Sequence, residues 1–305
     1  MTLRTDSRTA AFCDWLDATA PPAEEHRLRS ELGPMLCAAG ALKLSDDHYQ
    51  LGEGGTVKMG VKYGTFRVSF SGAAIAMLKL HGYWESALFE LGAGPHRVTR
   101  LDAAVDFPMD GADAIAALLD AYPRGEVRLG QRPIRTSEYL NTRPDGRKTG
   151  TWYAGDRRKA EVTARVYDKA WQLLDKRGEV VPPRTRAELT VRKGVGPTLR
   201  DAAEPERIFW HYMAPSVLER PEGVPEWTSG WAEGWSMERV EILPAQALKR
   251  RIEQSPELAA LVELADAAGP HGRSMALRLI EQKIRRSPGA GSRTSSVPAS
   301  GSGGS

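Results

Sequence analysis

Three segments of the chain alternate apolar with polar residues at the period of two that is typical of β-strands. In each of them one face is apolar and the other carries charged, hydroxyl or phenol side chains. The polar faces hold Arg100, Asp102 and Asp106 in residues 97–107, Thr163, Arg165, Tyr167 and Lys169 in 161–169, and Arg186, Glu188, Thr190 and Arg192 in 186–192. The pattern predicts three strands of a sheet with one reactive face.

Further elements follow from the same reading. Residues 12–45 are expected to be helix and loop, because Leu28, Leu32, Met35 and Leu36 recur at helical spacing. A hairpin with its turn near residues 63–64 is predicted from the alternation on either side of it. The remaining predicted elements are strands at 56–61, 65–70 and 151–154, and helices at 73–80, 110–119, 170–176, 245–252, 256–268 and 273–286. No internal repeat stands out.

The mixture of strands and helices predicts an α+β fold with an antiparallel sheet. A core over residues 1–200 is expected to be followed by a helical module over 204–286. Residues 287–305, SPGAGSRTSSVPASGSGGS, contain almost no apolar side chain and are predicted to be a disordered tail.

Composition excludes several classes of protein. The chain of 305 residues is 41% hydrophobic and 27% charged, which is ordinary for a globular protein. It has no apolar run long enough to cross a membrane and no secretory signal, so a cytoplasmic location in a bacterial host is expected. The motifs GxxxxGK[ST], HExxH, CxxC and GxSxG are all absent. Their absence argues against ATP binding, zinc sites and serine hydrolysis.

Positive charge is concentrated in one part of the chain. Residues 143–193 carry fourteen Lys and Arg against seven Asp and Glu, a surplus of +7, whereas the whole chain has a net charge of +3. A basic segment within a nearly neutral protein is typical of a phosphate-binding surface, although a solvated charged surface would look the same.

The residue types on the three polar faces suit phosphodiester chemistry. An antiparallel sheet with one solvated face would also alternate, but Asp is depleted in strands. Carboxylates such as Asp102 and Glu188 could hold Mg²⁺ or Mn²⁺, while Asp106 lies roughly 13 Å along the strand from Asp102. Tyr167 is the candidate nucleophile and Tyr153 the alternative. Lys169 would stabilise developing charge, and Arg100, Arg165 and Arg186 would position phosphates.

At these residues the sequence resembles the replication initiation factors of filamentous phages and rolling-circle plasmids. The matching segments are CDWLDAT near the start, RVTRLDAAVDF at 97–107, TWYAGDRRKAEVTARVYDK at 151–169 and RAELTVR at 186–192. They occur in the family's order and span about the first 200 residues. Asp156 departs from the family's Gly-Ser-Arg pattern, and no histidine pair is present to bind a metal.

The resemblance implies a rolling-circle replication initiator: a metal-dependent endonuclease that nicks one strand of an origin. Tyr167 would form a 5′-phosphotyrosyl link and leave a free 3′-hydroxyl as primer. Asp102, Asp106 and Glu188 would be the acidic metal-binding positions on a sheet of split βαβ type, as in HUH endonucleases and RRM domains. The predicted DNA-binding residues are Arg100, Arg157, Arg165, Arg186 and Arg192.

Two other functions are considered. A phage or plasmid regulator could have the same fold and bind DNA without catalysis. An RNA-binding sheet of the RRM type requires exposed aromatic residues on its central strands, whereas these polar faces carry acidic residues. The partners expected for an initiator are origin DNA, as a single strand or extruded loop, a host helicase and a host DNA polymerase. A second copy of the chain is a further candidate partner, and no membrane partner is expected.

Overall fold

The structure is a computed structural model that describes residues 10–130, 132–143, 145–156, 158–213, 221–230, 256–269 and 272–278. The chain divides into two compact units, Met1–Val240 and Glu241–Ser305. In the second unit, α9 (Pro256–Ala267) confirms a predicted helix. The predicted helix at 245–252 and the predicted tail at 287–305 lie outside the described residues.

The first unit is built on a ten-stranded sheet in the order β2-β3-β4-β5-β1-β6-β12-β11-β10-β9, in which every neighbouring pair is antiparallel. Its strands are β1 (Phe12–Ala20), β2 (Leu42–Ser45), β3 (His48–Leu51), β4 (Gly55–Lys62), β5 (Thr65–Ser71), β6 (Arg97–Phe107), β9 (Thr136–Thr142), β10 (Lys148–Ala154), β11 (Val162–Asp168) and β12 (Thr185–Arg192). Two short strands, β7 (Arg128–Leu129) and β8 (Arg132–Pro133), form a separate pair.

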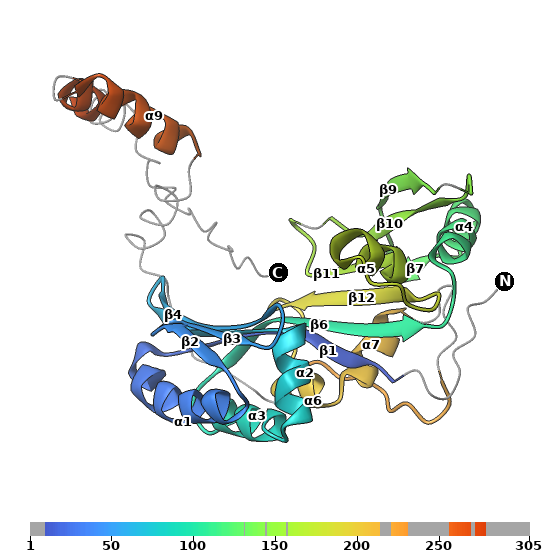
Figure 1. The fold of residues 1–305 in the computed structure, drawn as a ribbon, viewed down its shortest axis with the longest axis horizontal. Coiled ribbons are helices and arrows are strands. Elements are labelled where there is room, and N and C mark those ends of the chain that lie inside the picture. Colours follow the sequence, from blue (N-terminus) through green and yellow to red (C-terminus); the bar gives the residue numbers. More distant parts are fainter. Residues whose placement is uncertain are drawn as a thin grey trace, which may run out of the picture. The chain divides into compact units, whose positions relative to one another are not determined.

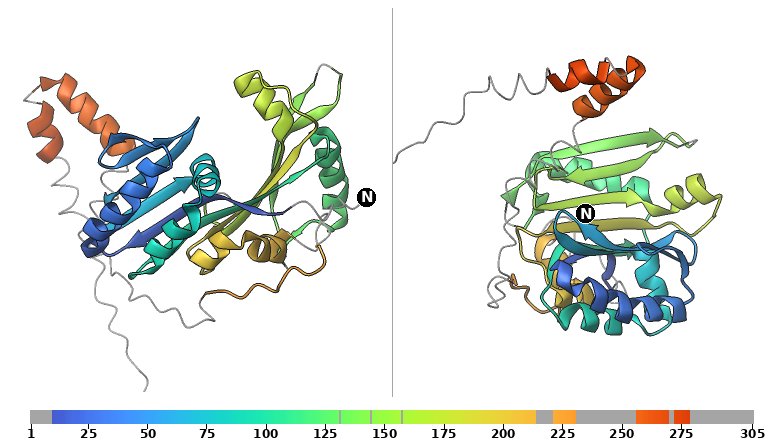
Figure 2. Two further views of the ribbon diagram at one scale, coloured as in Figure 1. Left: turned by 60° about the horizontal axis from the view of Figure 1, so that its bottom comes forward. Right: turned by 90° about the vertical axis from the view of Figure 1, so that its left-hand side faces the viewer.

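Helices pack against the central strands of this sheet as well as against strands toward both of its ends (Figure 1, Figure 2). The α-helices of the first unit are α1 (Glu25–Ala38), α2 (Gly72–Leu80), α3 (Trp84–Gly92), α4 (Gly111–Ala121), α5 (Lys169–Arg177), α6 (Leu199–Ala203) and α7 (Pro205–Met213), and the 3₁₀ helices are η1 (Pro22–Glu24) and η2 (Tyr122–Arg124). Helix α2 contacts β1 and β4, α6 and α7 contact β1 and β6, and α4 contacts β10 and β11.

The core forms where the apolar faces of strands and helices meet. Trp84, Trp210, Phe66, Phe70 and Phe209 are among the largest fully buried side chains, and Phe70 packs edge-on against Trp84 at 5.6 Å. Burying each of these rings stabilises the fold by roughly 1.5–3 kcal/mol. The predicted strands at 56–61, 65–70, 97–107 and 186–192 and the helix at 73–80 are confirmed within one or two residues at each end.

The prediction of helix and loop for residues 12–45 is wrong at its start, because Phe12–Ala20 is strand β1 at the centre of the sheet. The register against β6 shifts between Cys13 and Trp15, so Asp14 is an extra residue in a β-bulge. The bulge places Cys13 and Leu16, three residues apart, in the core. It thereby hides the period of two on which recognition of a strand depends.

The register of β1 against β6 is symmetric about a local two-fold axis, although the sequence has no evident repeat. Leu16 lies opposite Leu101, Trp15 opposite Asp102 and Asp17 opposite Arg100. The dipeptide Leu-Asp at 16–17 is therefore related to Leu-Asp at 101–102. Each strand also shifts register near this centre, at Asp14 on β1 and at Thr99 on β6.

The predicted class, helices with an antiparallel sheet, is confirmed, whereas the finer assignment to the HUH or RRM type stays a prediction. Helices α6 and α7 belong to the first unit, so residues 204–213 pack with the sheet. The division into core, helical module and tail otherwise stays a prediction. None of the described helices combines the length and apolar character that spanning a membrane requires.

Candidate active site

The three segments that alternate in sequence are neighbouring strands, in the order β6-β12-β11. Their polar residues therefore meet across the sheet. Arg165 lies opposite Glu188, Tyr167 opposite Arg186, and Arg186 opposite Asp106. These polar residues share one face, because side chains that lie opposite one another in an antiparallel pair point to the same side.

Tyr167 and Glu188 form the central contact of this face. The Tyr167 hydroxyl donates a hydrogen bond to Oε1 of Glu188 at 2.6 Å, and both side chains are buried. Burial, with the negative charge of Glu188, raises the pKa of the Tyr167 phenol well above its ordinary value. The phenol is therefore neutral at rest, with a carboxylate in position to take its proton.

Three carboxylates of the sheet are each covered by an arginine from the same face. Arg165 pairs with Glu188, Arg100 with Asp102 at 2.5 Å, and Arg67 with Asp17. The carboxylate side chains are 3–5% exposed, whereas the arginine side chains are 39–44% exposed. This arrangement buries the negative charges and leaves the positive ones at the surface, where a phosphate can approach them.

Arg186 is held between two carboxylates. It donates to both oxygens of Asp106, at 2.6 and 2.9 Å, and to Oδ1 of Asp14 at 3.3 Å, with its guanidinium over the ring of Phe12. Two partners and a ring fix the guanidinium next to Tyr167, where it can stabilise a charged phosphorus centre.

Asp14 is a site residue that the strand pattern missed. Burial, followed by the negative charge of Glu188, raises its pKa to about 6. It reaches this face because the bulge in β1 gives it an orientation that regular alternation would not. A usable signal was present, since Asp14 belongs to the CDWLDAT segment.

Lys169 begins α5 directly beyond the end of β11, and its ammonium lies 5.8 Å from the centre of the Tyr167 ring. The same ammonium donates to Oε1 of Gln172 at 2.9 Å. Burial, together with the positive charge of Arg186, lowers the pKa of Lys169 and makes it a better proton donor.

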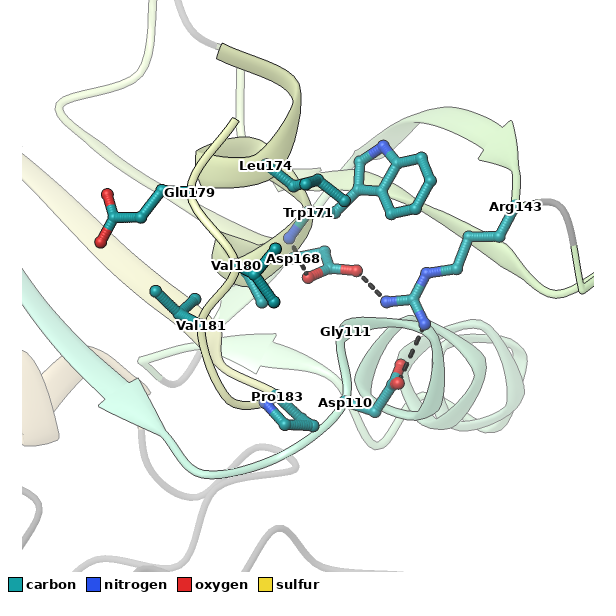
Figure 3. Close-up of a pocket in the computed structure, with 11 residues that line it drawn as sticks. Asp110, Gly111, Arg143, Asp168, Trp171, Leu174, Glu179, Val180, Val181 and Pro183 are labelled. Carbon is teal, nitrogen blue, oxygen red and sulfur yellow. Dashed lines mark hydrogen bonds and ion pairs between the residues drawn. The ribbon is translucent and has the colours of Figure 1, made fainter. Parts of the chain in front are cut away.

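A polar network fixes the start of α5 between Tyr167 and Lys169 (Figure 3). Asp168 caps the helix by accepting from the Trp171 amide at 2.9 Å, and it also binds Thr149 and Arg143. Arg143 reaches on to Asp110, the cap of α4. Asp110, Arg143, Asp168 and Trp171 line a cavity of ≈ 170 Å³, and the two ion pairs of Arg143 connect the start of α4 to the start of α5.

The carboxylates have the oxygen donors that Mg²⁺ and Mn²⁺ prefer. Asp14, Asp102 and Glu188 are also close enough to repel one another, since the charge of Glu188 raises the pKa of both aspartates. Among the described residues, however, no three Asp, Glu, His or Cys side chains are grouped tightly enough to hold an ion. Asp106 faces Arg186 instead. The metal set Asp102, Asp106 and Glu188 stays a prediction.

Two other predicted DNA contacts, Arg100 and Arg192, lie opposite each other and further along the strands from Tyr167 than Arg186 does. Arg192 donates to the Ala160 carbonyl at 2.5 Å, and Arg157 is outside the described residues. Tyr153, the alternative nucleophile, is on β10. It lies opposite Arg165 of β11 and packs edge-on against Tyr139. The hydrogen bond to Glu188 distinguishes Tyr167 from Tyr153.

No family model matches the chain, and no curated protein is similar to it. Two solved structures are similar at a low level. A rolling-circle replication initiator protein from Geobacillus stearothermophilus has 17% sequence identity and a TM-score of 0.42, over 67% of this chain and 79% of that one. The di-domain ARO/CYC BexL from the BE-7585A biosynthetic pathway has 14% sequence identity and a TM-score of 0.20, over 72% of this chain and 100% of that one. At these scores neither similarity assigns a fold or an activity to the chain.

Proposed function

We propose that this chain is a rolling-circle replication initiator that nicks one strand of an origin through Tyr167. The observation that carries the proposal is the 2.6 Å hydrogen bond from the buried Tyr167 hydroxyl to Glu188, on a face where arginines cover buried carboxylates. The segments that carry the sequence resemblance support it further. They contain β1, β6, β10, β11 and β12, which are contiguous in the sheet.

In the proposed reaction the Tyr167 oxygen attacks the scissile phosphorus as its proton passes to Glu188. A bond forms between phosphorus and the tyrosine oxygen, and the bond from phosphorus to the 3′ oxygen breaks. The 5′-phosphate is then attached to Tyr167, and Lys169 supplies the proton that completes the 3′-hydroxyl. Arg165 and Arg186 stabilise the additional charge on the phosphate oxygens.

The proposal includes a Mg²⁺ or Mn²⁺ ion near Glu188, held with Asp14 or Asp102 rather than with Asp106, both of whose oxygens accept from Arg186. Such an ion would act as a Lewis acid toward the phosphate. The carboxylates can bind such an ion only if their arginine partners move away from them. The phosphates of bound DNA would provide these arginines with other anions to pair with. DNA and ion binding are therefore expected to favour each other.

Further parts of the proposal concern partners. Attack on a buried tyrosine requires an accessible strand, so an unpaired loop or strained segment of origin DNA is the expected substrate. A host helicase and a host polymerase would act on the nicked product, and the helical residues beyond 204 are candidates for recruiting them.

The experiment that tests the proposal is denaturing gel analysis with supercoiled DNA that carries the cognate replicon. The wild type is expected to give a nick and a covalent protein–DNA adduct with Mn²⁺ or Mg²⁺, and neither with EDTA. Tyr167→Phe should abolish both products, because it removes only the attacking oxygen. Glu188→Gln should slow nicking by about 10²- to 10⁴-fold, the usual range for a lost general base.

Tyr153→Phe is the matched control, since it removes a hydroxyl from the same face and should leave the adduct intact. An adduct that survives in Tyr167→Phe but not in Tyr153→Phe would reverse the assignment of the nucleophile. Binding of DNA by the wild type without any nick would identify the chain as a non-catalytic regulator instead.

A further inference from the structure

An aromatic pair lies on the same sheet face as Tyr167, toward the edge of the sheet. Tyr139 on β9 and Tyr153 on β10 pack edge-on, with their ring centres 5.8 Å apart. Tyr139 is 70% exposed, one of the most exposed large side chains of the described chain. The Tyr139 ring is therefore accessible to a ligand, and unlike a single exposed ring it lies beside a second ring that packs against it.

The register of the strands connects this pair to the candidate active site. Tyr139 lies opposite Thr151, which lies opposite Tyr167. Adjacent strands are about 4.8 Å apart, so the backbones at Tyr139 and Tyr167 are about 10 Å apart across the sheet. Tyr153 lies opposite Arg165, the half-exposed arginine that pairs with Glu188. A cation for a phosphate and two rings for a base are thus adjacent.

We propose that Tyr139, supported by Tyr153, is a stacking site for an unpaired base of the DNA strand whose phosphate Tyr167 attacks. This inference rests on the proposed function and adds a subsite to it. The edge-on packing of Tyr153 holds the Tyr139 ring, and the exposed face of that ring can stack on a flat base. Arg165 binds the backbone beside it, which sets the strand in line with Tyr167.

Single-stranded DNA is the occupant that the surroundings favour. An apolar protein partner would want a continuous apolar surface, whereas the residues of this face next to the two rings include Ser137 and Thr151. Base stacking on aromatic side chains tolerates any sequence, so the site can be tested without knowledge of the origin.

The test measures binding of the full chain to two fluorescein-labelled probes by anisotropy, in EDTA. One probe is an oligothymidylate of about 15 nucleotides, and the other is an abasic oligonucleotide with the same number of phosphates. The wild type should prefer the probe with bases by about 5- to 150-fold, the range expected for one stacked base. Tyr139→Ala should lose this preference, and Tyr139→Phe should keep it.

Salt dependence separates stacking from charge. Tyr139→Ala should leave the slope of log affinity against log salt unchanged, because no phosphate contact is removed. Phe89→Ala, which truncates a 72% exposed ring on α3, is the control and should behave as the wild type. Circular dichroism of each variant checks that the fold is kept.

The outcomes are distinguishable. If the wild type binds DNA but Tyr139→Ala retains the preference for bases, the stacking site is wrong and the proposed function stands. If the wild type binds neither probe, the stacking site is wrong, and the nicking assay decides on the proposed function. A change in oligomeric state in Tyr139→Ala without a change in base preference would assign the rings to a contact between two copies and overturn the proposal.

Discussion

The charged side chains at the candidate site balance one another. Five cations, Arg67, Arg100, Arg165, Lys169 and Arg186, lie on one face with five carboxylates, Asp14, Asp17, Asp102, Asp106 and Glu188. What distinguishes the face is depth, because most of the carboxylates are buried beneath exposed guanidinium groups. Removing one arginine would leave a buried carboxylate unpaired, which is costly, so these pairs stabilise the arrangement of the site in the absence of any ligand.

At this scale Asp14 makes the stability of the protein depend on pH. Its pKa is about 6 in the folded chain, above the 3.8 of an aspartate in water, so the folded state binds its proton more tightly than the unfolded state. The resulting stabilisation is complete below 3.8 and is lost as pH rises to about 6, an amount of about 3 kcal/mol. Asp14→Asn should remove this loss and make the protein more stable at neutral pH.

Urea unfolding of both proteins across this pH window measures the effect. Asp113→Asn, at a 59% exposed position on α4, is the control and should keep the wild-type pH profile. An Asp14→Asn variant that loses stability at neutral pH would show that the contact with Arg186 outweighs the cost of burying the carboxylate.

At the scale of elements, the local two-fold axis relates the strands around β1 to those around β6. This axis relates β5 to β12 and β4 to β11. By the strand registers, Arg67 on β5 is equivalent to Glu188 on β12, and Lys62 on β4 is equivalent to Tyr167 on β11. The N-terminal half thus has cations where the C-terminal half has the proposed nucleophile and its proposed proton acceptor.

The start of α4 is packed too tightly against the active-site strand for a side chain at Gly111. A Cβ there would lie 2.3–2.6 Å from Cβ, Cγ and Cα of Asp168, the residue between Tyr167 and Lys169. Gly111→Ala should therefore destabilise the protein by about 1–3 kcal/mol and reduce nicking as Asp168 is displaced.

Chemical denaturation with the nicking assay measures both effects. Gly92→Ala is a suitable control, because its Cβ would meet only Leu199 at an ordinary 3.5 Å. It should be neutral or stabilise α3 by up to about 1 kcal/mol. A Gly111→Ala variant as stable as the wild type would mean that α4 can move away from Asp168.

At the scale of the whole molecule, one side of the central strands is covered by α6 and α7. These helices lie beyond the segments that carry the sequence resemblance. Ile208, Phe209 and Trp210 of α7 are fully buried, and α7 contacts β1, β6 and β12. Trp227 donates from its indole to buried Asp201 at 2.8 Å. The strands that carry the candidate site therefore pack against residues well after position 200.

Truncation tests this dependence. A chain that ends at Val240 retains α6, α7 and Trp227 and should unfold cooperatively and nick DNA. A chain that ends at Arg200 loses the buried rings of α7, each of which contributes roughly 3–5 kcal/mol. Because the total stability of an ordinary protein is only about 5–15 kcal/mol, this shorter chain should not fold. Thermal unfolding and the gel assay measure the result. A folded, active 1–200 fragment would show that α7 is dispensable.

The local pattern of the sequence determined the strands β6, β11 and β12 and which of their residues share a face. Regular alternation is a property of consecutive residues, so Tyr167, Glu188 and Arg165 could be assigned together before any fold was known. The CDWLDAT segment pointed to the region of Asp14, although its strand was read as helix and loop because a bulge breaks the alternation.

Only the tertiary structure decided which strands are neighbours and what each polar residue touches. Three contacts show this: Arg186 pairs with Asp14, α7 packs against β6, and Tyr139 packs against Tyr153. No local pattern of the sequence indicates any of them. Such contacts depend on register and on the order of strands, which are set by the packing of the whole core. Chemistry was therefore visible in the sequence as residue types, while the site itself came from the fold.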